Sequence, residues 1–444
     1  MEEEANHHAI DISNIIDRER LASMELKISE NPKFLCKAAG KRSCCIFRVP
    51  QSLVEVNGKA YQPRIVSIGP YHRNQPRLNM IEEHKWRYLG SLLSRTNTIG
   101  FVLEDLFKAI APLESEAREC YSETINLDSH DFIQMMILDG CFIIELFRKV
   151  ARLVPFERED PLLTMVWILP FFYRDFLKLE NQIPFFILNQ LYQVTKLPGE
   201  KSTPTLSTLA LLFFNNSLQK PDESLQNDVQ GKHLLDLVRS SFIPKNDEET
   251  EPRKRVMTPT HVILCVSKLR RAGIKINPSK ESESFLNVKF RRGVIEMPSL
   301  TVDDFMSSFL LNCVALEQCY SGCSKHFTAY ITLLDCLVNT YRDVEYLCDR
   351  NVVENHLGTE GEVASFINNA GKDVAVDLDL CYLSLLFNDV HKYYINSWHV
   401  QWASFKHTYF DTPWSFISLL AASILLLLTV AQTYFSASQY FHQT

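Results

Sequence analysis

The sequence predicts a mainly α (α+β) fold: a helical domain with a small antiparallel sheet and one C-terminal transmembrane helix. Glycine is scarce, at 14 of 444 residues, which disfavours turn-rich β-sandwiches and glycine-rich phosphate-binding loops. Apolar residues recur at helical spacing along most of the chain and alternate at strand spacing mainly between 285 and 297. The stretch 414–435 contains no Asp, Glu, Lys or Arg.

Charge and cysteine content exclude several classes of protein. The chain carries 46 Lys and Arg against 53 Asp and Glu, a net charge of -7, so it lacks the basic excess that brings a domain onto nucleic acid. Its 12 cysteines include no CxxC pair, and we expect reduced thiols that pack as small apolar groups, with no metal and no other cofactor. The N-terminus is acidic and has no apolar signal segment, which predicts synthesis in the cytosol.

The predicted organisation has a loosely ordered N-terminal arm, a large helical domain, a transmembrane helix and a short tail. Their bounds are 1–43 for the arm, 44–410 for the domain, 414–435 for the span and 436–444 for the tail. A sharp rise in polar and charged residues over 219–259 indicates a surface insertion within the domain.

The first elements expected in the domain are a short helix over 51–57, an extended run over 64–68, and an amphipathic helix over 78–93. Gly69 follows the extended run and ends it. The pattern of the third element places Lys85 on its polar side.

The segment 131–153 is apolar enough to be considered as a second membrane span. Asp139 and Glu145 interrupt it, and a central aspartate costs about 2.5–3.5 kcal/mol on membrane-insertion scales. We therefore predict a buried core helix. A further apolar helix is expected from Phe185, directly after Pro184.

The sheet is predicted from three pieces: 273–276, the alternating residues 285–290, and 294–297 after a turn at Gly293. The residues 301–304 form a helix-capping sequence, and apolar residues follow it at helical spacing.

The stretch 414–435 predicts a membrane anchor, and a long helix over 382–409 leads to it. Twenty-two residues of helix span about 33 Å, which matches a hydrocarbon core of about 30 Å. Because few residues follow, we expect insertion after translation, with the large domain in the cytosol and the lipid bilayer as a partner. The anchor residues are Trp414, Leu419, Leu420, Leu425, Leu426, Leu427, Leu428, Tyr434 and Phe435.

The common catalytic signatures are missing, since the sequence has no GxSxG, GxxxxGK[ST], GxGxxG or HExxH. What remains is a group of acids inside apolar helices, which would provide proton donors or a metal site if several met in one cleft. Acids of this kind also act as helix caps and as partners of Arg or Lys, and we favour that structural role. The catalytic candidates are Asp139, Glu145, Asp175, Glu180 and Glu317.

Several short motifs follow one another along the chain. They are Ile68-Gly69-Pro70-Tyr71-His72, Leu179-Glu180-Asn181-Gln182-Ile183-Pro184-Phe185-Phe186, Ala272-Gly273-Ile274, Leu300-Thr301-Val302-Asp303-Asp304, Ala315-Leu316-Glu317-Gln318-Cys319, Tyr409-Phe410 and Pro413-Trp414. In this order they resemble the plant family called domain of unknown function 247, from about residue 44 to 436. The chain departs from the family pattern at Arg73-Asn74, where His-Gly is frequent, and at Met297, where Ile is usual.

The resemblance implies a membrane-associated plant protein with no established catalytic activity, and it supplies no catalytic residues. It also implies kinship with grass proteins associated with self-incompatibility and with others associated with growth or stress responses. We therefore predict a tail-anchored module for protein interaction, signalling or recognition, with an unidentified protein partner and with homo-oligomers as an open alternative. A membrane-surface enzyme is the competing hypothesis, and it requires at least three of the five carboxylates to line one accessible cleft.

Overall fold

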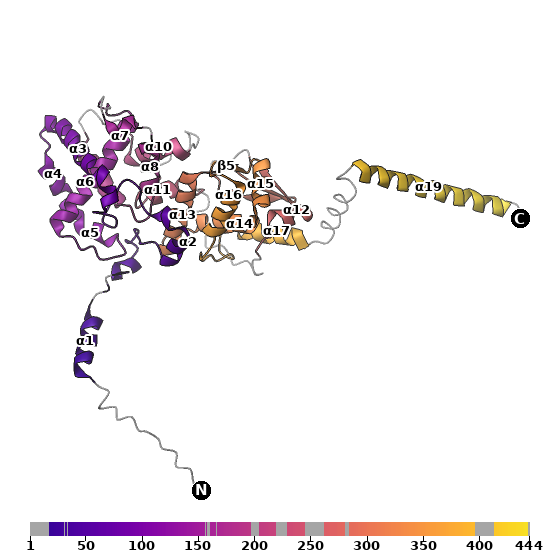
Figure 1. The fold of residues 1–444 in the computed structure, drawn as a ribbon, viewed down its shortest axis with the longest axis horizontal. Helices are drawn as coiled ribbons and strands as arrows, with labels where there is room; N and C mark the ends of the chain where they lie inside the picture. The colour runs from indigo at the N-terminus through magenta and orange to yellow at the C-terminus, as the bar shows by residue number, and fades with distance from the viewer. Residues whose placement is uncertain are drawn as a thin grey trace, which may run out of the picture.

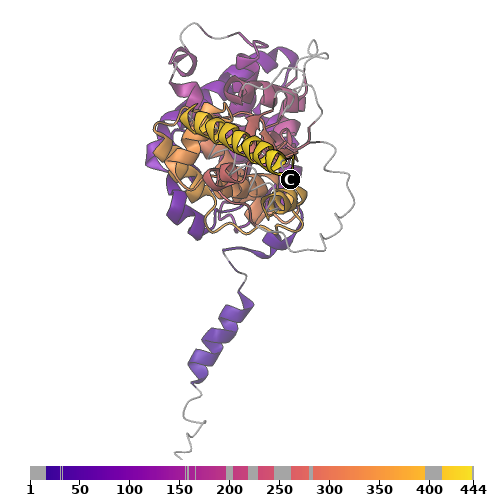
Figure 2. The ribbon, with the colours of Figure 1, turned by 90° about the vertical axis from the view of Figure 1, so that its right-hand side faces the viewer.

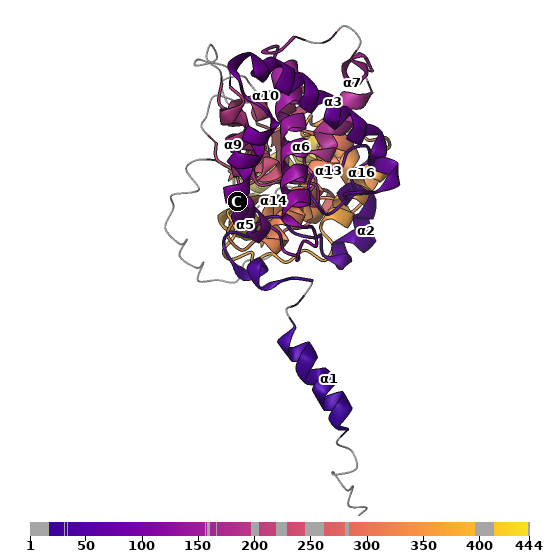
Figure 3. The ribbon, with the colours of Figure 1, turned by 90° about the vertical axis from the view of Figure 1, so that its left-hand side faces the viewer.

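The computed structural model describes residues 17–30, 32, 34–155, 157, 160–165, 167–196, 204–218, 229–244, 262–279, 284–395 and 413–442. Figure 1 shows a helical body with α1 (Arg18–Ser29) and α19 (Pro413–His442) extending away from it. None of the residues of α1 is buried, and Figures 2 and 3 show this helix clear of the body. The prediction of a mainly helical fold with a small sheet is confirmed.

The N-terminal half of the body is built around one buried helix, α6 (Ser129–Val150), in which almost every residue from Phe132 to Lys149 is buried. The other α-helices of this half are α2 (Gln51–Tyr61), α3 (Asn79–Thr96), α4 (Leu103–Ile110), α5 (Glu114–Glu119), α7 (Pro161–Thr164), α8 (Ile168–Asp175), α9 (Phe185–Val194), α10 (Leu206–Leu218) and α11 (Leu234–Ser240). Helices α3, α4, α9 and α10 pack against α6, which is why its sequence is apolar on every side. The prediction of a core helix over 131–153 is therefore confirmed.

A second buried helix, α13 (Asp304–Cys319), organises the C-terminal half. The remaining α-helices of this half are α12 (Val266–Arg271), α14 (His326–Leu337), α15 (Tyr341–Asp349), α16 (Glu360–Ala370) and α17 (Ser384–Ile395). The carboxylate of Asp303 accepts the N–H of Met306 at 2.7 Å and so caps α13 where the sequence predicts a helix start. Because α13 contacts α2, α8 and α11 as well as α14, it joins the two halves.

The strands form two small sheets, both in the C-terminal half. The first has the order β1 (Lys275–Pro278), β3 (Val294–Met297), β2 (Lys289–Arg291). Strands β2 and β3 are antiparallel, but β1 pairs in parallel with β3, so the sheet is mixed and not purely antiparallel as predicted. A parallel pair of β4 (Leu300–Val302) and β5 (Val353–Asn355) forms the second sheet.

Short 3₁₀ helices complete the body. They are η2 (Lys37–Gly40), η3 (Pro76–Leu78), η4 (Asn97–Ile99) and η5 (Ala111–Leu113).

An extended segment, residues 64–69, passes through the N-terminal half, and we call it the core segment. Ile65, Val66 and Ile68 on it are buried. In the described part of the chain it pairs with no strand. Its backbone groups therefore need partners other than a neighbouring strand.

Two sequence predictions fall partly outside the described residues. Of the predicted insertion over 219–259, the structure describes 229–244, which includes the largely buried helix α11. Of the helix predicted over 382–409, α17 covers the first part, and 396–412 lie outside the described residues.

The predicted C-terminal transmembrane helix is wrong. Among the described residues, no helix combines the length and the apolar character that a membrane span needs. The prediction rested on the absence of Asp, Glu, Lys and Arg over 414–435, which does not by itself make a membrane span.

The predictions of a tail anchor, a single-pass membrane location and a cytosol-facing domain depended on that span and are contradicted with it. Of the nine anchor residues, Trp414 and Leu419 have side chains outside the described set. The others, from Leu420 to Phe435, are exposed on α19.

Gly69 gives a direct test of how the core segment ends. Its φ is +72°, and a β-carbon there would lie 2.4 Å from the carbonyl oxygen of Gln182. Gly69→Ala combines backbone strain with this clash, so we expect it to lower the free energy of unfolding by about 3 kcal/mol. Urea unfolding of the full chain measures the loss.

A matched control is available in α3. A β-carbon on Gly90 would meet nothing within 4 Å, so Gly90→Ala should be neutral or stabilise the protein by up to about 1 kcal/mol. Equal destabilisation by the two substitutions would contradict the special role of Gly69.

Candidate functional site

The five candidate carboxylates lie in separate surroundings. Asp139 on α6 accepts a hydrogen bond from Lys85 Nζ at 2.6 Å and another from the N–H of Gly69 at 2.8 Å. Lys85 and Asp139 are 1% and 3% exposed, so they form an interior ion pair. The prediction that Lys85 lies on the polar side of its helix is therefore wrong, because this lysine points into the core to meet the aspartate.

Asp175 at the end of α8 binds backbone amides. Its carboxylate accepts the N–H groups of Arg64, Ile65 and Val66 at 2.9, 2.8 and 3.2 Å. Burial raises the pKa of Asp175. The hydrogen bonds from these amides lower it, but the effect of burial is larger. The carboxylate thus takes the place of a neighbouring strand at the start of the core segment.

Asn181 continues this pattern along the core segment. Its Oδ1 accepts the N–H of Ile68 at 2.7 Å, and its Nδ2 donates to the carbonyl oxygen of Val66 at 3.1 Å. Nδ2 also donates to the carbonyl oxygen of Asp175 at 3.0 Å. Asn181 therefore ties the core segment to the end of α8.

Glu180 lies between three donors. It contacts Arg48 Nη1 at 3.0 Å and His72 Nε2 at 3.1 Å, and it accepts the N–H of Val49 at 2.8 Å. Burial would raise the pKa of this carboxyl group, but the close contact with His72, the hydrogen bond from the N–H of Val49 and the charge of Arg48 bring the pKa below its ordinary value. Glu180 is therefore charged at neutral pH and joins the chain near Val49 to the turn after α8.

The last two candidates are bound by arginines. Glu145 contacts Arg95 at 2.6 Å and Arg148 at 3.0 Å. Glu317 accepts from Arg239 Nε at 2.9 Å and from two backbone amides at the start of α14, at 3.2 and 2.7 Å. Burial raises the pKa of Glu317, opposed by the charge of Arg239.

Of three surface pockets in the described chain, none is lined by more than one of the five acids. Asp175 borders a pocket near Lys178, and the other four candidates are absent from the lining of that pocket and of two more, near Phe185 and near Phe34. Among the described residues, no cluster of three or more His, Cys, Asp or Glu is arranged to hold a metal ion. The arrangement that the enzyme hypothesis requires does not appear at these pockets.

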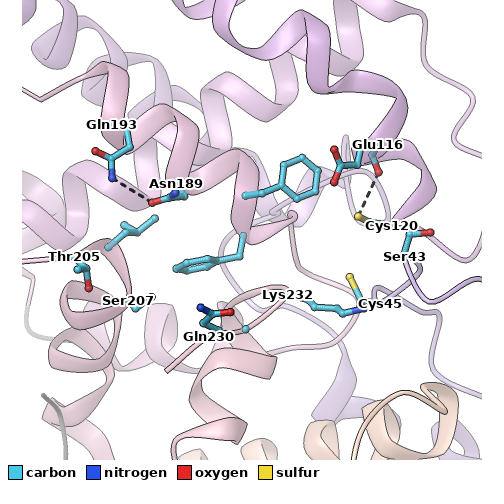
Figure 4. Close-up of a pocket in the computed structure, with 14 residues that line it drawn as sticks. Ser43, Cys45, Glu116, Cys120, Asn189, Gln193, Thr205, Ser207, Gln230 and Lys232 are labelled. Atoms are coloured by element: carbon cyan, nitrogen blue, oxygen red, sulfur yellow. Dashed lines mark hydrogen bonds between the residues drawn. The ribbon is translucent and has the colours of Figure 1, made fainter. Parts of the chain in front are cut away.

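The pocket near Phe185 has the chemistry of a recognition site, and we call it the phenylalanine pocket (Figure 4). Its volume is about 550 Å³, within the range of ordinary ligand pockets. Phe185 and Phe186, both half-buried, line it together with buried Leu206. The polar residues that line it are Ser43, Glu116, Asn189, Gln193, Thr205, Ser207, Gln230 and Lys232.

Several distant parts of the chain build this pocket. Figure 4 shows Gln193, Asn189 and Thr205 towards one end and Glu116 and Ser43 towards the other. The first two belong to α9, which begins directly after Pro184 and therefore brings Phe185 and Phe186 to the pocket with its first turn. The sequence predicted this helix start but gave no signal for the remaining segments.

Two cysteines also line the phenylalanine pocket. The hydrogen bond with Cys120 and burial together raise the pKa of Cys45 well above its ordinary value. The thiol of Cys45 is therefore protonated near neutral pH and lacks the thiolate that a cysteine nucleophile needs.

The motifs that carry the family resemblance meet in the interior. The glycine of the first motif packs against the carbonyl oxygen of Gln182 in the second, and His72 contacts Glu180 at 3.1 Å. Asn312 of α13 accepts the N–H of Leu179 through Oδ1 at 2.9 Å. The second motif then continues into Phe185 and the phenylalanine pocket.

A double-mutant cycle tests the interior ion pair. Asp139→Asn leaves the Lys85 ammonium buried without its main carboxylate, so we expect a loss of about 3 kcal/mol or more in the free energy of unfolding. Adding Lys85→Met removes the stranded charge and should recover part of that loss. Urea unfolding of the wild type, the two single variants and the double variant gives the coupling free energy between the two side chains.

The exposed pair of Glu104 and Lys108, 72% and 67% exposed, is the control. Glu104→Gln should change the free energy of unfolding by less than about 1 kcal/mol. Strictly additive losses at Asp139 and Lys85 would contradict an ion pair in the core.

Comparisons with known proteins agree on one relationship. A family model described as plant protein of unknown function, domain of unknown function 247, matches residues 46–428. The UPF0481 protein At3g47200 of Arabidopsis thaliana is 38% identical over 426 residues, which cover 91% of this chain and 88% of that protein. The putative UPF0481 protein At3g02645 of the same plant is 24% identical over 486 residues, with 88% and 89% covered.

No solved structure matches the chain. The family match nevertheless spans most of the folded body, from the chain before α2 into α19, and contains the core segment and all residues of the phenylalanine pocket except Ser43 and Cys45. The chain belongs to the plant family of unknown function called domain of unknown function 247.

Proposed function

We propose that the chain is a protein-recognition module that binds an extended segment of a partner protein at the phenylalanine pocket. The observation that carries this proposal is the composition of the pocket, in which two half-buried phenylalanines lie mainly among amides and hydroxyls, with one acid, Glu116, and one base, Lys232. Protein interfaces are enriched in such aromatic residues and are depleted of charge at their centre.

The polar groups suit a peptide backbone. Asn189, Gln193 and Gln230 are exposed at the pocket, and each side-chain amide has both donors and an acceptor. An extended segment presents N–H and C=O groups on its edges, so amides of this kind can bind it whatever its side chains are. Phe185 and Phe186 would then select an apolar side chain as the anchor.

The surroundings of the pocket favour binding over catalysis. The thiol of Cys45 is protonated, and the candidate acids of the core are held by their own cations and amides. A module of this kind needs rigid walls, and α9 and α10 supply them because both pack against α6.

Peptide selection on the purified full-length protein tests the proposal. We expect enriched peptides to share one apolar or aromatic residue flanked by uncharged residues. Phe186→Glu places a charge where the anchor binds and should weaken binding of these peptides about thirtyfold. Gln193→Ala, which leaves the apolar part intact, should weaken it by a smaller factor.

The matched control is Trp86→Glu, the same kind of change at an aromatic residue that is 49% exposed on α3. It should leave peptide affinity unchanged. The proposal fails if no peptide is enriched, or if peptides bind the Phe186 and Trp86 variants equally well while both remain folded by circular dichroism.

A further inference from the structure

A second pocket, distinct from the phenylalanine pocket, lies where the end of α2, the end of α8 and the start of α13 meet. Its volume is about 440 Å³. The charged residues that line it are Lys59, Arg64, Arg174, Asp175, Lys178 and Asp304. Four cations against two carboxylates make it locally basic.

Both carboxylates of this pocket are already engaged. Asp175 accepts three backbone amides of the core segment. Asp304 contacts Arg174 Nη1 at 3.0 Å, and its side chain is 70% exposed. Asp304 therefore offsets one of the four cations, Arg174, and even with Asp175 ionised the cations of the pocket outnumber its acids.

Two of the cations are available to a ligand. Lys59 and Arg64 are exposed, and neither side chain has an ion pair among the described residues. The guanidinium of Arg64 presents paired donors in one plane, which suit the oxygens of a phosphate group.

Lys178 adds a cation at a deeper position. It is 2% exposed, and its Nζ donates to the carbonyl oxygen of Ala60 at 2.7 Å and to Ser308 Oγ at 3.0 Å. An ammonium group has three donors, so one remains after these two bonds. Burial lowers the pKa of Lys178 to about 8, opposed by Asp175, so the amine is mostly protonated at neutral pH.

Ser307 provides an independent sign of a ligand. It lies in the first turn of α13, lines the pocket, and is 8% exposed. Its Oγ is buried and has no hydrogen-bond partner among the described residues. Since buried hydroxyls are normally paired, an unpaired one on a residue that lines a basic pocket marks a position for a ligand oxygen.

We propose that this pocket binds a small phosphate monoester, with Arg64 and Lys178 on the phosphate oxygens and Ser307 Oγ donating to one of them. The amino terminus of α13, a helix of 16 residues, adds a favourable dipole. The pocket is larger than an inorganic phosphate ion needs, which leaves room for the organic part of an ester.

Titration of the full-length protein with glycerol phosphate, followed by phosphorus NMR and calorimetry, tests this site. We expect saturable binding at millimolar ligand or below, with weaker binding of inorganic phosphate and none of acetate. Arg64→Ala should weaken binding about tenfold. This variant is expected to fold because the Arg64 side chain is exposed.

Ser307→Ala separates binding from folding. It removes an unpaired buried hydroxyl, so it should not lower the unfolding midpoint of the free protein. It should nevertheless weaken the binding of glycerol phosphate severalfold. Lys108→Ala, which removes a cation 67% exposed on α4, should leave affinity unchanged.

Phe186→Glu should bind glycerol phosphate like the wild type, which keeps this result independent of the phenylalanine pocket. The absence of saturable binding by the folded wild type would overturn the proposal. So would equal affinity of the wild type, Arg64→Ala and Lys108→Ala.

Discussion

The need to satisfy a buried backbone is the constraint on which the N-terminal half depends. The core segment 64–69 passes through the interior without a neighbouring strand in the described chain, and unpaired buried N–H and C=O groups are too costly to leave. N–H groups of this segment are accepted by the side chains of Asp175, Asn181 and Asp139, and Asn181 also donates to one of the segment's carbonyl oxygens. Since Asp139 is then a buried charge, Lys85 must be buried with it.

This constraint explains why motifs far apart in the chain belong together. The first family motif includes the end of the core segment, and the second contains Asn181 and Glu180, which hold the first in place. The same second motif ends in Phe185 and Phe186, so the residues that fix the interior also position the phenylalanine pocket. These two family motifs therefore contain residues that hold the core segment in the interior and residues that begin the helix at the phenylalanine pocket.

Local patterns predicted local structure well, and contacts across the chain could not be predicted from them. The apolar run around α6 and the cap at Asp303 follow from spacing and side-chain chemistry within a few residues. The partner of Asp139 is 54 residues away on a helix whose pattern placed Lys85 outside. Both pockets join distant segments, and the C-terminal prediction failed because a run of uncharged letters does not by itself fix a membrane span.

Amide hydrogen exchange of residues 64–69 tests the central role of the core segment most directly. Because side chains from α6, α8 and the turn after α8 accept the N–H groups of residues 64–66, 68 and 69, these amides should open only when the N-terminal half unfolds and should exchange as slowly as the amides of α6. Exchange as fast as that of α1, which has no buried residue, would contradict the account.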